Sequence, residues 1–377
     1  MTPPSIPRLL IGILLITPLI GWSWYTSQKR KNIELPITQT LTPTKSEIGY
    51  MPVQIITRKE VPTVHAASAV ELTDGSIRSY WFGGTREGAQ DVSIWSSRWD
   101  IETKTWDPPT IALDPRWLEN TTELNLRKLG NPVAYRSPNG PVELFVVGVS
   151  MGGWSGSAIY HLTSDDEGAT FSSPRRLTSS PFFNISTLVK GAILETSEGG
   201  IIIPAYHEFI EKYPISIHLD AERKITYLTP YREAEGQIQP WIVPSKNGSE
   251  LLLRDASDTQ RVHTFANAQL TALNIPNPNS AVAAITLAEG TLLACNDLEE
   301  GRHQLHLYLR KPGESQWKFL HEVEVPSSED DDQGINKPRY SYPWLMQTAQ
   351  KELHLFYTWN RREIRHLRFD TRDWPSL

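Results

Sequence analysis

The stretch SDDEGATF, residues 164–171, combines three consecutive acids with a glycine and a terminal aromatic residue. Such a stretch can be a calcium-binding loop, a source of catalytic carboxylates or a tight turn. A calcium loop of the EF-hand type needs a bidentate glutamate at its twelfth position. Counted from Asp165 or Asp166, that position holds Arg176 or Leu177. In a turn, an aspartate side chain bonds backbone N–H groups and a glycine supplies a positive φ. The spacing therefore favours a turn in which Asp166 is structural.

Short apolar runs separated by turn signals fill the chain from about residue 51 onward. Examples are PVELFVVGV (141–149), GGIIIPAYHE (199–208) and KELHLFYTW (351–359). Asp-Gly, Asn-Gly, Gly-Gly or Glu-Gly pairs stand just before many of these runs, which is typical of β-hairpins. No stretch keeps a 3.6-residue apolar period for three turns. The body is therefore predicted to be all-β.

A unit of strand, turn, strand, polar loop and aromatic-ended strand recurs six times, at intervals of roughly 40 to 65 residues. The units are expected to close near Trp106, Phe171, Tyr227, Ala268, Trp317 and Phe369. This recurrence predicts a six-bladed β-propeller of four-stranded blades. The alternative, a pair of β-sandwiches, does not explain why the unit returns. SDDEGATF then falls between the third and fourth strands of the second blade, and residues 97–106 and 310–317 occupy equivalent places.

Composition excludes several classes of function. The 377 residues carry a formal net charge of −6, spread along the chain, which argues against a nucleic-acid partner with its clustered basic face. Cys295 is the only cysteine, so neither an internal disulfide nor a cysteine zinc site can form. Thirteen tryptophans suit either packing between sheets or flat platforms for sugar rings.

The N-terminus carries a hydrophobic segment, LLIGILLITPLIGWSWY (residues 9–25), flanked by basic residues. It is close to the shortest length that spans a bilayer, and no small-residue cleavage site follows it. Residues 1–25 are therefore predicted to be a signal-anchor or transmembrane segment, 26–50 a linker, and 51–377 the propeller. The body is expected in the periplasm or outside the cell. The basic residues after the segment favour the alternative, a cytoplasmic body.

The Asp-box pattern Ser-x-Asp-x-Gly-x-Thr-aromatic, within this set of blades, resembles the sialidase (neuraminidase) superfamily. The closer resemblance is to its bacterial sialidase-like branch of Asp-box (BNR repeat) propellers, over roughly residues 60 to 370. The stretches that carry it, besides SDDEGATF, are WFGGTREGAQDVSIW (81–95), LVKGAILETSEGGIIIPAYHE (188–208), LLLRDA (251–256), LNIPNPNSAVAAI (273–285), NDLEEGRHQLHL (296–307) and YSYPWLMQTAQKELHLFYTWNRREIRHLRFD (340–370).

The resemblance implies a site at one end of the propeller axis, with a tyrosine nucleophile, an assisting glutamate, an aspartate acid/base and three arginines. Tyr340 in YSYP takes the nucleophile's place, and Tyr342 is a rival because it would point the same way in a strand. Asp91, after FGGTREG, takes the place of the acid/base. Arg254 in LLLRDA and Arg302 in NDLEEGRHQL match the middle and late arginines, whose forks would hold a carboxylate.

Two positions depart from the family pattern. His65 stands where the first arginine is expected, and Gln239 stands where the assisting glutamate is expected. A glutamine cannot take a proton from a tyrosine. Either another carboxylate does so, with Glu208 and Glu87 as the candidates, or the chemistry is altered. Further substrate-binding candidates, which supply positive charge or end an apolar strand, are Arg86, Lys190 and His207.

Each candidate also has a structural interpretation. Arg86 could pair with Glu87, Asp255 could pair with Arg254, and Tyr340 could be a packing residue. The basic residues Arg361, Arg362 and Arg365 are interpreted as a mainly solvated face, from which one member could line the channel. The acidic stretch EDDDQG (329–334) is interpreted as an exposed loop.

Two functions remain open at this point. The first is a glycoside hydrolase of the exo-α-sialidase type that acts on an acidic or polar sugar of a glycan or polysaccharide, with no cofactor and no metal. The second is a non-catalytic glycan-binding propeller in an envelope polysaccharide system, which the departures at His65 and Gln239 favour.

Overall fold

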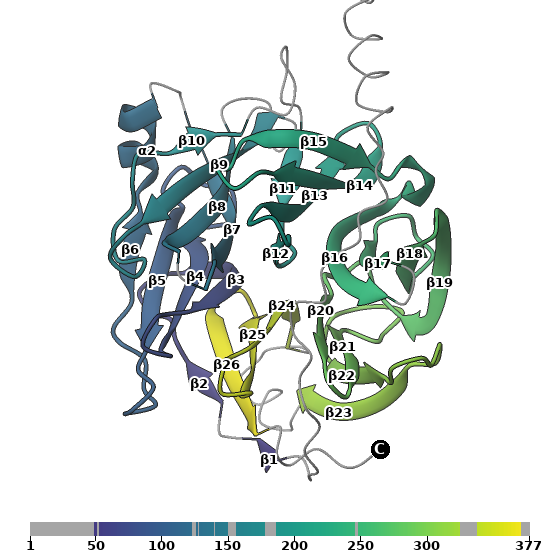
Figure 1. Cartoon of the computed structure of the whole chain (residues 1–377). Helices are drawn as coiled ribbons and strands as arrows, with labels where there is room; N and C mark the ends of the chain where they lie inside the picture. The colour runs from purple at the N-terminus through teal and green to yellow at the C-terminus, as the bar shows by residue number, and fades with distance from the viewer. Residues whose placement is uncertain are drawn as a thin grey trace, which may run out of the picture.

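A computed structural model describes residues 49–50 and 53–370, apart from 123–125, 127, 139, 150–155, 178–185, 246–247 and 325–337. Six antiparallel sheets stand in a ring with their first strands toward the centre (Figure 1). The predicted six-bladed propeller of four-stranded blades is confirmed, and the β-sandwich alternative is wrong. The predicted N-terminal anchor, most of the predicted linker and the predicted loop 329–334 lie outside the described residues.

The first three blades follow one another along the chain. Blade 1 holds β3 (Thr63–Glu71), β4 (Ile77–Gly84), β5 (Ser93–Trp99) and β6 (Thr110–Leu113), followed by the short helix α2 (Pro115–Thr122). Blade 2 holds β7 (Lys128–Arg136), β8 (Val142–Val149), β9 (Ser157–Ser164) and β10 (Arg175–Arg176). Blade 3 has a split inner strand, β11 (Thr187–Val189) and β12 (Leu194–Glu195), then β13 (Ile201–Glu208), β14 (Lys212–Leu219) and β15 (Ile225–Pro230).

The last three blades complete the ring. After the 3-10 turn η2 (Arg232–Ala234), blade 4 holds β16 (Gln237–Ser245), β17 (Gly248–Asp255), β18 (Arg261–Ala266) and β19 (Gln269–Pro276). Blade 5 holds β20 (Ala283–Leu287), β21 (Gly290–Cys295), β22 (Leu305–Arg310) and β23 (Lys318–Glu324). Blade 6 holds β24 (Tyr340–Gln347), β25 (Leu353–Trp359) and β26 (Glu363–Asp370).

The N-terminal strands close the ring by supplying the outer position of blade 6. Both β1 (Gly49–Tyr50) and β2 (Gln54–Ile55) pair antiparallel with β26, and Tyr50 stands opposite Phe369. The propeller thus includes Gly49 and Tyr50, just before its expected start. Since first and last segments share one sheet, backbone hydrogen bonds hold the two ends of the propeller together.

Aromatic side chains fill the space between blades 1 and 6, which are neighbours, and between blades 4 and 6, which lie on either side of blade 5. Trp241 of β16 and Trp344 of β24 pack edge to face with ring centroids 5.2 Å apart, and both are almost fully buried. Trp81 and Trp99 of blade 1 are equally buried. Four of the tryptophans therefore serve packing between sheets, which is the commoner of their two expected uses.

The SDDEGATF turn joins β9 to β10, the third and fourth strands of blade 2, as predicted. The Asp166 carboxylate accepts hydrogen bonds from the Thr170 backbone N–H at 2.9 Å, the Thr170 hydroxyl at 2.6 Å and the Ser164 hydroxyl at 2.7 Å. These bonds hold the pKa of Asp166 at about 2, with the Thr170 hydroxyl contributing most. Asp166 is therefore a structural residue of its own turn.

The same turn also fastens blade 2 to blade 1. The Tyr80 hydroxyl donates to the Gly168 carbonyl at 3.0 Å, and Arg78 Nε donates to the Glu167 carbonyl at 2.7 Å. Gly168 has a φ of +79°, and a Cβ there would lie 2.0 Å from the Tyr80 hydroxyl oxygen. Glycine is thus required both by the backbone conformation and by the close approach of the next blade.

None of the helices in the described residues is long and apolar enough to cross a membrane.

Candidate functional site

The inner strands of four blades are interrupted near their first residues, where the pairing register of β3, β7, β16 and β24 shifts. The residues with positive φ at these bulges are Ala66 (54°), Asn131 (41°), Gln239 (53°) and Tyr342 (52°). A left-handed backbone at a non-glycine residue costs free energy, and such strain gathers at functional sites. A bulge also breaks the alternation of side chains, so it can turn a polar side chain toward the axis.

All four bulges lie at one end of the ring, which we call the bulge face. Because neighbouring strands in a blade are antiparallel, the β4–β5, β13–β14, β17–β18, β21–β22 and β25–β26 connections lie at the same end. The Asp166 turn follows β9 and therefore lies at the opposite end. Any site built on the bulges is thus remote from SDDEGATF, as the sequence predicts.

Gln239 links two tyrosines at the centre of the bulge face. Its Nε2 donates to the Tyr206 hydroxyl oxygen at 3.2 Å and to the Tyr342 hydroxyl oxygen at 3.4 Å. Its Oε1 accepts from Arg254 Nη1 at 3.1 Å. The amide thus orients both phenols but cannot accept a proton from either, because its nitrogen is a donor here.

Tyr206 of β13 is fully buried beside this amide and also accepts from Asn131 Nδ2 at 3.3 Å. Burial raises the pKa of Tyr206 well above its usual value, and the charges of Tyr342 and Glu208 act in the same direction. Tyr206 is therefore a neutral phenol. Glu208, two residues further along β13, lies on the same side of the strand as Tyr206.

Lys190 follows β11 at the gap in the inner strand of blade 3 and is fully buried. Its Nζ donates to the Ala67 carbonyl at 3.2 Å and lies 5.5 Å from the Tyr342 ring centroid and 5.1 Å from that of Trp344. Burial lowers the pKa of Lys190 to about 7. The structure therefore brings an amine that can change protonation near neutrality against the face of Tyr342.

His65 of β3 packs edge to face against Tyr342, with ring centroids 4.4 Å apart, and against Phe82 at 5.7 Å. It is almost fully buried, and its Nδ1 has no hydrogen-bond partner within the described part of the chain. Burial lowers the pKa of His65 well below its usual value. The positive charges of Arg361, Arg302, Lys190 and Arg254 lower it further. His65 is therefore a neutral imidazole.

Arg254 and Arg302 share one acceptor residue, Asn279, which precedes β20. Arg254 Nε donates to Asn279 Oδ1 at 2.8 Å, and Arg302 Nη2 donates to the Asn279 carbonyl at 2.7 Å. Arg302 Nη1 also donates to the Ser341 hydroxyl at 3.3 Å. All of these acceptors are neutral, as is Gln239, and neither arginine forms an ion pair among the described residues. The expected pairing of Arg254 with Asp255 is replaced by these bonds.

The guanidiniums of Arg254 and Arg302 are both half-buried, and their positive charges repel each other. Burial lowers the pKa of Arg302 to about 10, and the positive charges of Arg254, Arg339 and Arg361 act in the same direction. Buried charges without a counter-charge are costly, and a binding site for an anion is one reason to keep them. The pair therefore forms a candidate anion site beside Tyr342.

Tyr340 and Tyr342 do not point the same way, contrary to the expectation from strand alternation. Tyr340 is 1% exposed and belongs to the main apolar core, with its ring 6.2 Å from that of Tyr357. The bulge at Tyr342 breaks the period of two and turns its ring toward Gln239, Lys190 and His65. Of the two tyrosines, Tyr342 is therefore the one at the candidate site.

The β4–β5 connection carries Arg86, Glu87 and Asp91. Glu87 Oε2 pairs with Arg361 Nη2 at 3.0 Å, which replaces the expected pairing with Arg86. Asp91 is exposed and accepts from the Thr85 backbone N–H at 3.0 Å and the Thr85 hydroxyl at 2.9 Å. Arg86 is exposed on the same turn. The turn is linked to the axial residues by the ion pair between Glu87 and Arg361, whose charge acts on His65.

His207 and Glu208 end β13 on opposite sides of the strand. The His207 ring stacks on Tyr213 with centroids 5.0 Å apart, away from Tyr206 in the alternation of the strand. The Glu208 backbone N–H donates to the Ser186 hydroxyl at 3.0 Å. Of this pair, the structure brings Glu208 to the tyrosines and places His207 against the next strand of its own blade.

Sequence reasoning missed Asn131, Tyr206 and Asn279 and gave Arg361 little weight. One local signal would have helped: GNPV, IQPW and SYPW are three stretches with a polar residue before a proline, and each marks an inner-strand bulge. Tyr206 and Arg361 have no such signal, because their contacts join different blades.

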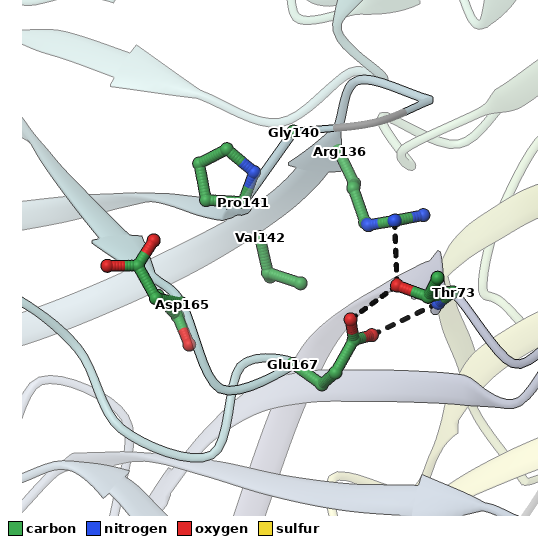
Figure 2. Close-up of a pocket in the computed structure, with 8 residues that line it drawn as sticks. Thr73, Arg136, Gly140, Pro141, Val142, Asp165 and Glu167 are labelled. Carbon is green, nitrogen blue, oxygen red and sulfur yellow. Dashed lines mark hydrogen bonds between the residues drawn. The ribbon is translucent and has the colours of Figure 1, made fainter.

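A pocket of about 340 Å³ lies at the opposite end of the ring, beside the Asp166 turn. Figure 2 shows that its polar side chains bond to one another: Thr73 donates from its backbone N–H and hydroxyl to the Glu167 carboxylate, and Arg136 Nη2 donates to the Thr73 hydroxyl at 2.8 Å. These bonds join blades 1 and 2. We therefore assign this pocket to the interface between blades.

A family model described as a BNR repeat-like domain matches residues 75–355. No curated protein matches the sequence at a significant level. Among solved structures, a Hadza microbial sialidase has a TM-score of 0.62 at 15% identity, over 81% of this chain and 65% of its own length.

Two further solved structures match over nearly their whole length. A protein of unknown function from Dyadobacter fermentans has a TM-score of 0.63 at 13% identity, over 86% of this chain and 99% of that chain. The intramolecular trans-sialidase from Ruminococcus gnavus, in complex with oseltamivir carboxylate, has a TM-score of 0.61 at 13% identity, over 85% and 98%. At these identities the likeness is one of fold.

Proposed function

Because the chain belongs to the BNR repeat-like domain family, whose model covers most of it, we propose that it is a glycoside hydrolase of the exo-α-sialidase type. Its substrate is an acidic sugar at the end of a glycan or polysaccharide. One observation carries the proposal: two guanidiniums with only neutral acceptors stand beside a strained axial tyrosine.

The anion site selects the substrate. Arg254 and Arg302 are already oriented by Asn279, so binding a carboxylate requires little further ordering of their side chains. A guanidinium has five N–H donors in a planar fork, so each can keep its present bonds and still face a carboxylate. The solved trans-sialidase with bound oseltamivir carboxylate is a relative in fold that takes a carboxylate ligand.

Tyr342 is the nucleophile in this proposal, in place of Tyr340. A neutral phenol can approach the anomeric carbon of an anionic ketoside without the repulsion that a carboxylate would meet. The tyrosine oxygen attacks that carbon, and Asp91 protonates the departing sugar oxygen and later activates a water. Glu208 is the candidate acceptor for the tyrosine proton, since its charge acts on the neighbouring Tyr206.

The proposal is tested by hydrolysis of 4-methylumbelliferyl sialosides and uronides with the full chain. Tyr342→Phe should lower kcat by at least about a hundredfold, because the phenol oxygen is the attacking atom. Tyr340→Phe is the matched control, since this tyrosine lies in the core, and it should keep the rate within about threefold of wild type. Full activity in Tyr342→Phe would reject Tyr342 as the nucleophile.

The second candidate is a propeller that binds glycans without cleaving them. Gln239, held between two tyrosines, favours it, because this amide cannot serve as the base that a sialidase tyrosine needs. Binding of a sialylated or uronic-acid glycan with no product after prolonged incubation would support this candidate over the hydrolase.

Residues 1–25 are proposed to anchor the protein, with the body in the periplasm or outside the cell, on the strength of the apolar segment 9–25. External protease added to intact cells should then digest the body. Protection of the body until the cells are lysed would instead favour a cytoplasmic location.

A further inference from the structure

The turn between β25 and β26 is held in a strained and fixed conformation. Asn360 and Arg361 both have positive φ, 49° and 57°, which is the backbone of a tight hairpin turn but costs free energy without glycine. Asn360 Oδ1 accepts from the Arg339 backbone N–H at 2.6 Å, just before β24. The turn is therefore anchored to the start of the inner strand of blade 6.

The same turn is bonded to the start of the first blade. The Arg361 carbonyl accepts from the Val64 backbone N–H at 2.8 Å, next to His65. In the family that this chain resembles, the first arginine precedes this inner strand, and His65 stands in its place here. A guanidinium from the last blade is therefore fastened beside the position from which one is missing.

The positive charge of Arg361 acts on two axial residues, His65 and Arg302. After burial, Arg361 is the strongest of the charges that lower the pKa of His65, ahead of Arg302 and Lys190. Arg361 also acts together with burial in lowering the pKa of Arg302. The half-exposed Arg361 thus lies within electrostatic reach of His65 and of Arg302.

Glu87 of the first blade holds the Arg361 side chain, with Oε2 3.0 Å from Nη2. Glu87 is one of two candidates for the base that assists the tyrosine, but its carboxylate already contacts the Arg361 guanidinium. A positioning role fits this contact better. Because Arg361 has five donors, it can keep the contact with Glu87 and bind a second carboxylate.

We propose that Arg361 is the third guanidinium of the anion site, supplied by the last blade instead of the first, and that Glu87 positions it. With Arg254 and Arg302 it makes a site for a sugar that carries a carboxylate, and a neutral sugar of the same shape is disfavoured. This inference rests on the proposed function for the location of the site, but it concerns binding and not turnover.

The test compares free acids with their methyl esters, which differ only in the charge of the carboxylate. Affinities of N-acetylneuraminic acid, glucuronic acid and galacturonic acid for the full chain are measured by ligand-observed NMR, beside each ester. Wild type should prefer at least one acid to its ester by about tenfold or more. Arg361→Gln should lose most of that preference while its affinity for the ester stays unchanged.

Two variants separate this role from a structural one. Arg362→Gln, in the same exposed turn, should keep the full preference, as a control for general charge. Glu87→Gln keeps the Arg361 guanidinium but removes its ion pair with Glu87. This variant should lower the affinity for the acid only about threefold. Both Arg361→Gln and Glu87→Gln keep the backbone bond to Val64, so their thermal unfolding should match that of wild type.

The outcomes are distinct. An undiminished acid preference in Arg361→Gln overturns the inference and leaves the proposed hydrolase intact. No preference for any acid in wild type overturns the inference as well, even if a neutral glycoside is cleaved. Loss of the preference in Arg361→Gln supports it even if no substrate is turned over.

Discussion

The Asp166 turn and the Gln239 bulge are both tight, polar stretches of backbone, but their side chains are used in opposite ways. The Asp166 carboxylate accepts its hydrogen bonds from Ser164 and Thr170, within its own turn. Gln239 instead connects three residues from distant parts of the chain, Tyr206, Arg254 and Tyr342. A polar group that bonds within its own turn stabilises the fold, whereas one that joins several blades beside an arginine without a counter-charge prepares a place for a ligand.

The largest expected effect is at the anion site, where function and stability should move in opposite directions. Arg302→Met should lower kcat/KM for an acidic glycoside by about 100- to 1000-fold, since it removes a fork from the carboxylate. The free energy of unfolding should stay the same or rise by up to about 1 kcal/mol, because a half-buried unpaired charge is removed. Enzyme kinetics and urea denaturation check the two parts, and a variant that is both inactive and strongly destabilised would contradict the contrast.

The next effect is at the opposite end of the ring. Gly168→Ala should lower the free energy of unfolding by about 2–3 kcal/mol, because the new Cβ meets the Tyr80 hydroxyl and the backbone has positive φ. Activity per folded molecule should be unchanged. Urea denaturation and kcat of the folded fraction are the measurements, with Gly199→Ala as control, where φ is +75° but the Cβ lies 3.8 Å from its neighbour. Equal losses in the two variants would show that the blade contact contributes nothing.

The third effect, which is the smallest when measured over a single pH unit, is a pH dependence that originates at Lys190. Burial lowers its folded pKa to about 7, below the unfolded value, so the unfolded chain binds more protons between about pH 7 and pH 10. The cost of the buried charge is fully present below pH 7 and is relieved as pH rises, by at most about 1.4 kcal/mol per pH unit. Lys190→Met should remove this rise from the curve of unfolding free energy against pH. Identical curves for wild type and variant would contradict the assignment.

The architecture was predictable from local sequence because each blade repeats the same hairpin signals. The six residues near which the units were expected to close lie in or close to strands. Trp106 and Phe171, for example, stand just before the fourth strands β6 and β10. The closure by β1 and β2 was not predictable, since nothing in those short segments specifies a partner at the far end of the chain.

The sequence predicted which residues lie near the axis better than it predicted which residues contact one another. Arg254, Arg302, Lys190 and Gln239 lie near one another, because strand ends of different blades meet at the axis. Their roles in binding stay a prediction. The expectation that Tyr340 and Tyr342 point the same way followed from strict strand alternation, which a bulge overrides.

The pairing of Glu87 with Arg361 joins residues far apart in sequence and could not be read from either neighbourhood.

The ring closure has a consequence for the time the chain needs to mature. Gly49 pairs with Asp370, so the first strand of the propeller must wait until about 320 residues more have been made. At about 5–20 residues per second, synthesis of that length takes roughly 15 to 60 seconds. During this interval blade 1 lacks its neighbour in blade 6, and both apolar faces at the opening are exposed. Chaperone contact during synthesis should therefore concentrate on blade 1 and on the most recently made blade, and should end when β26 emerges.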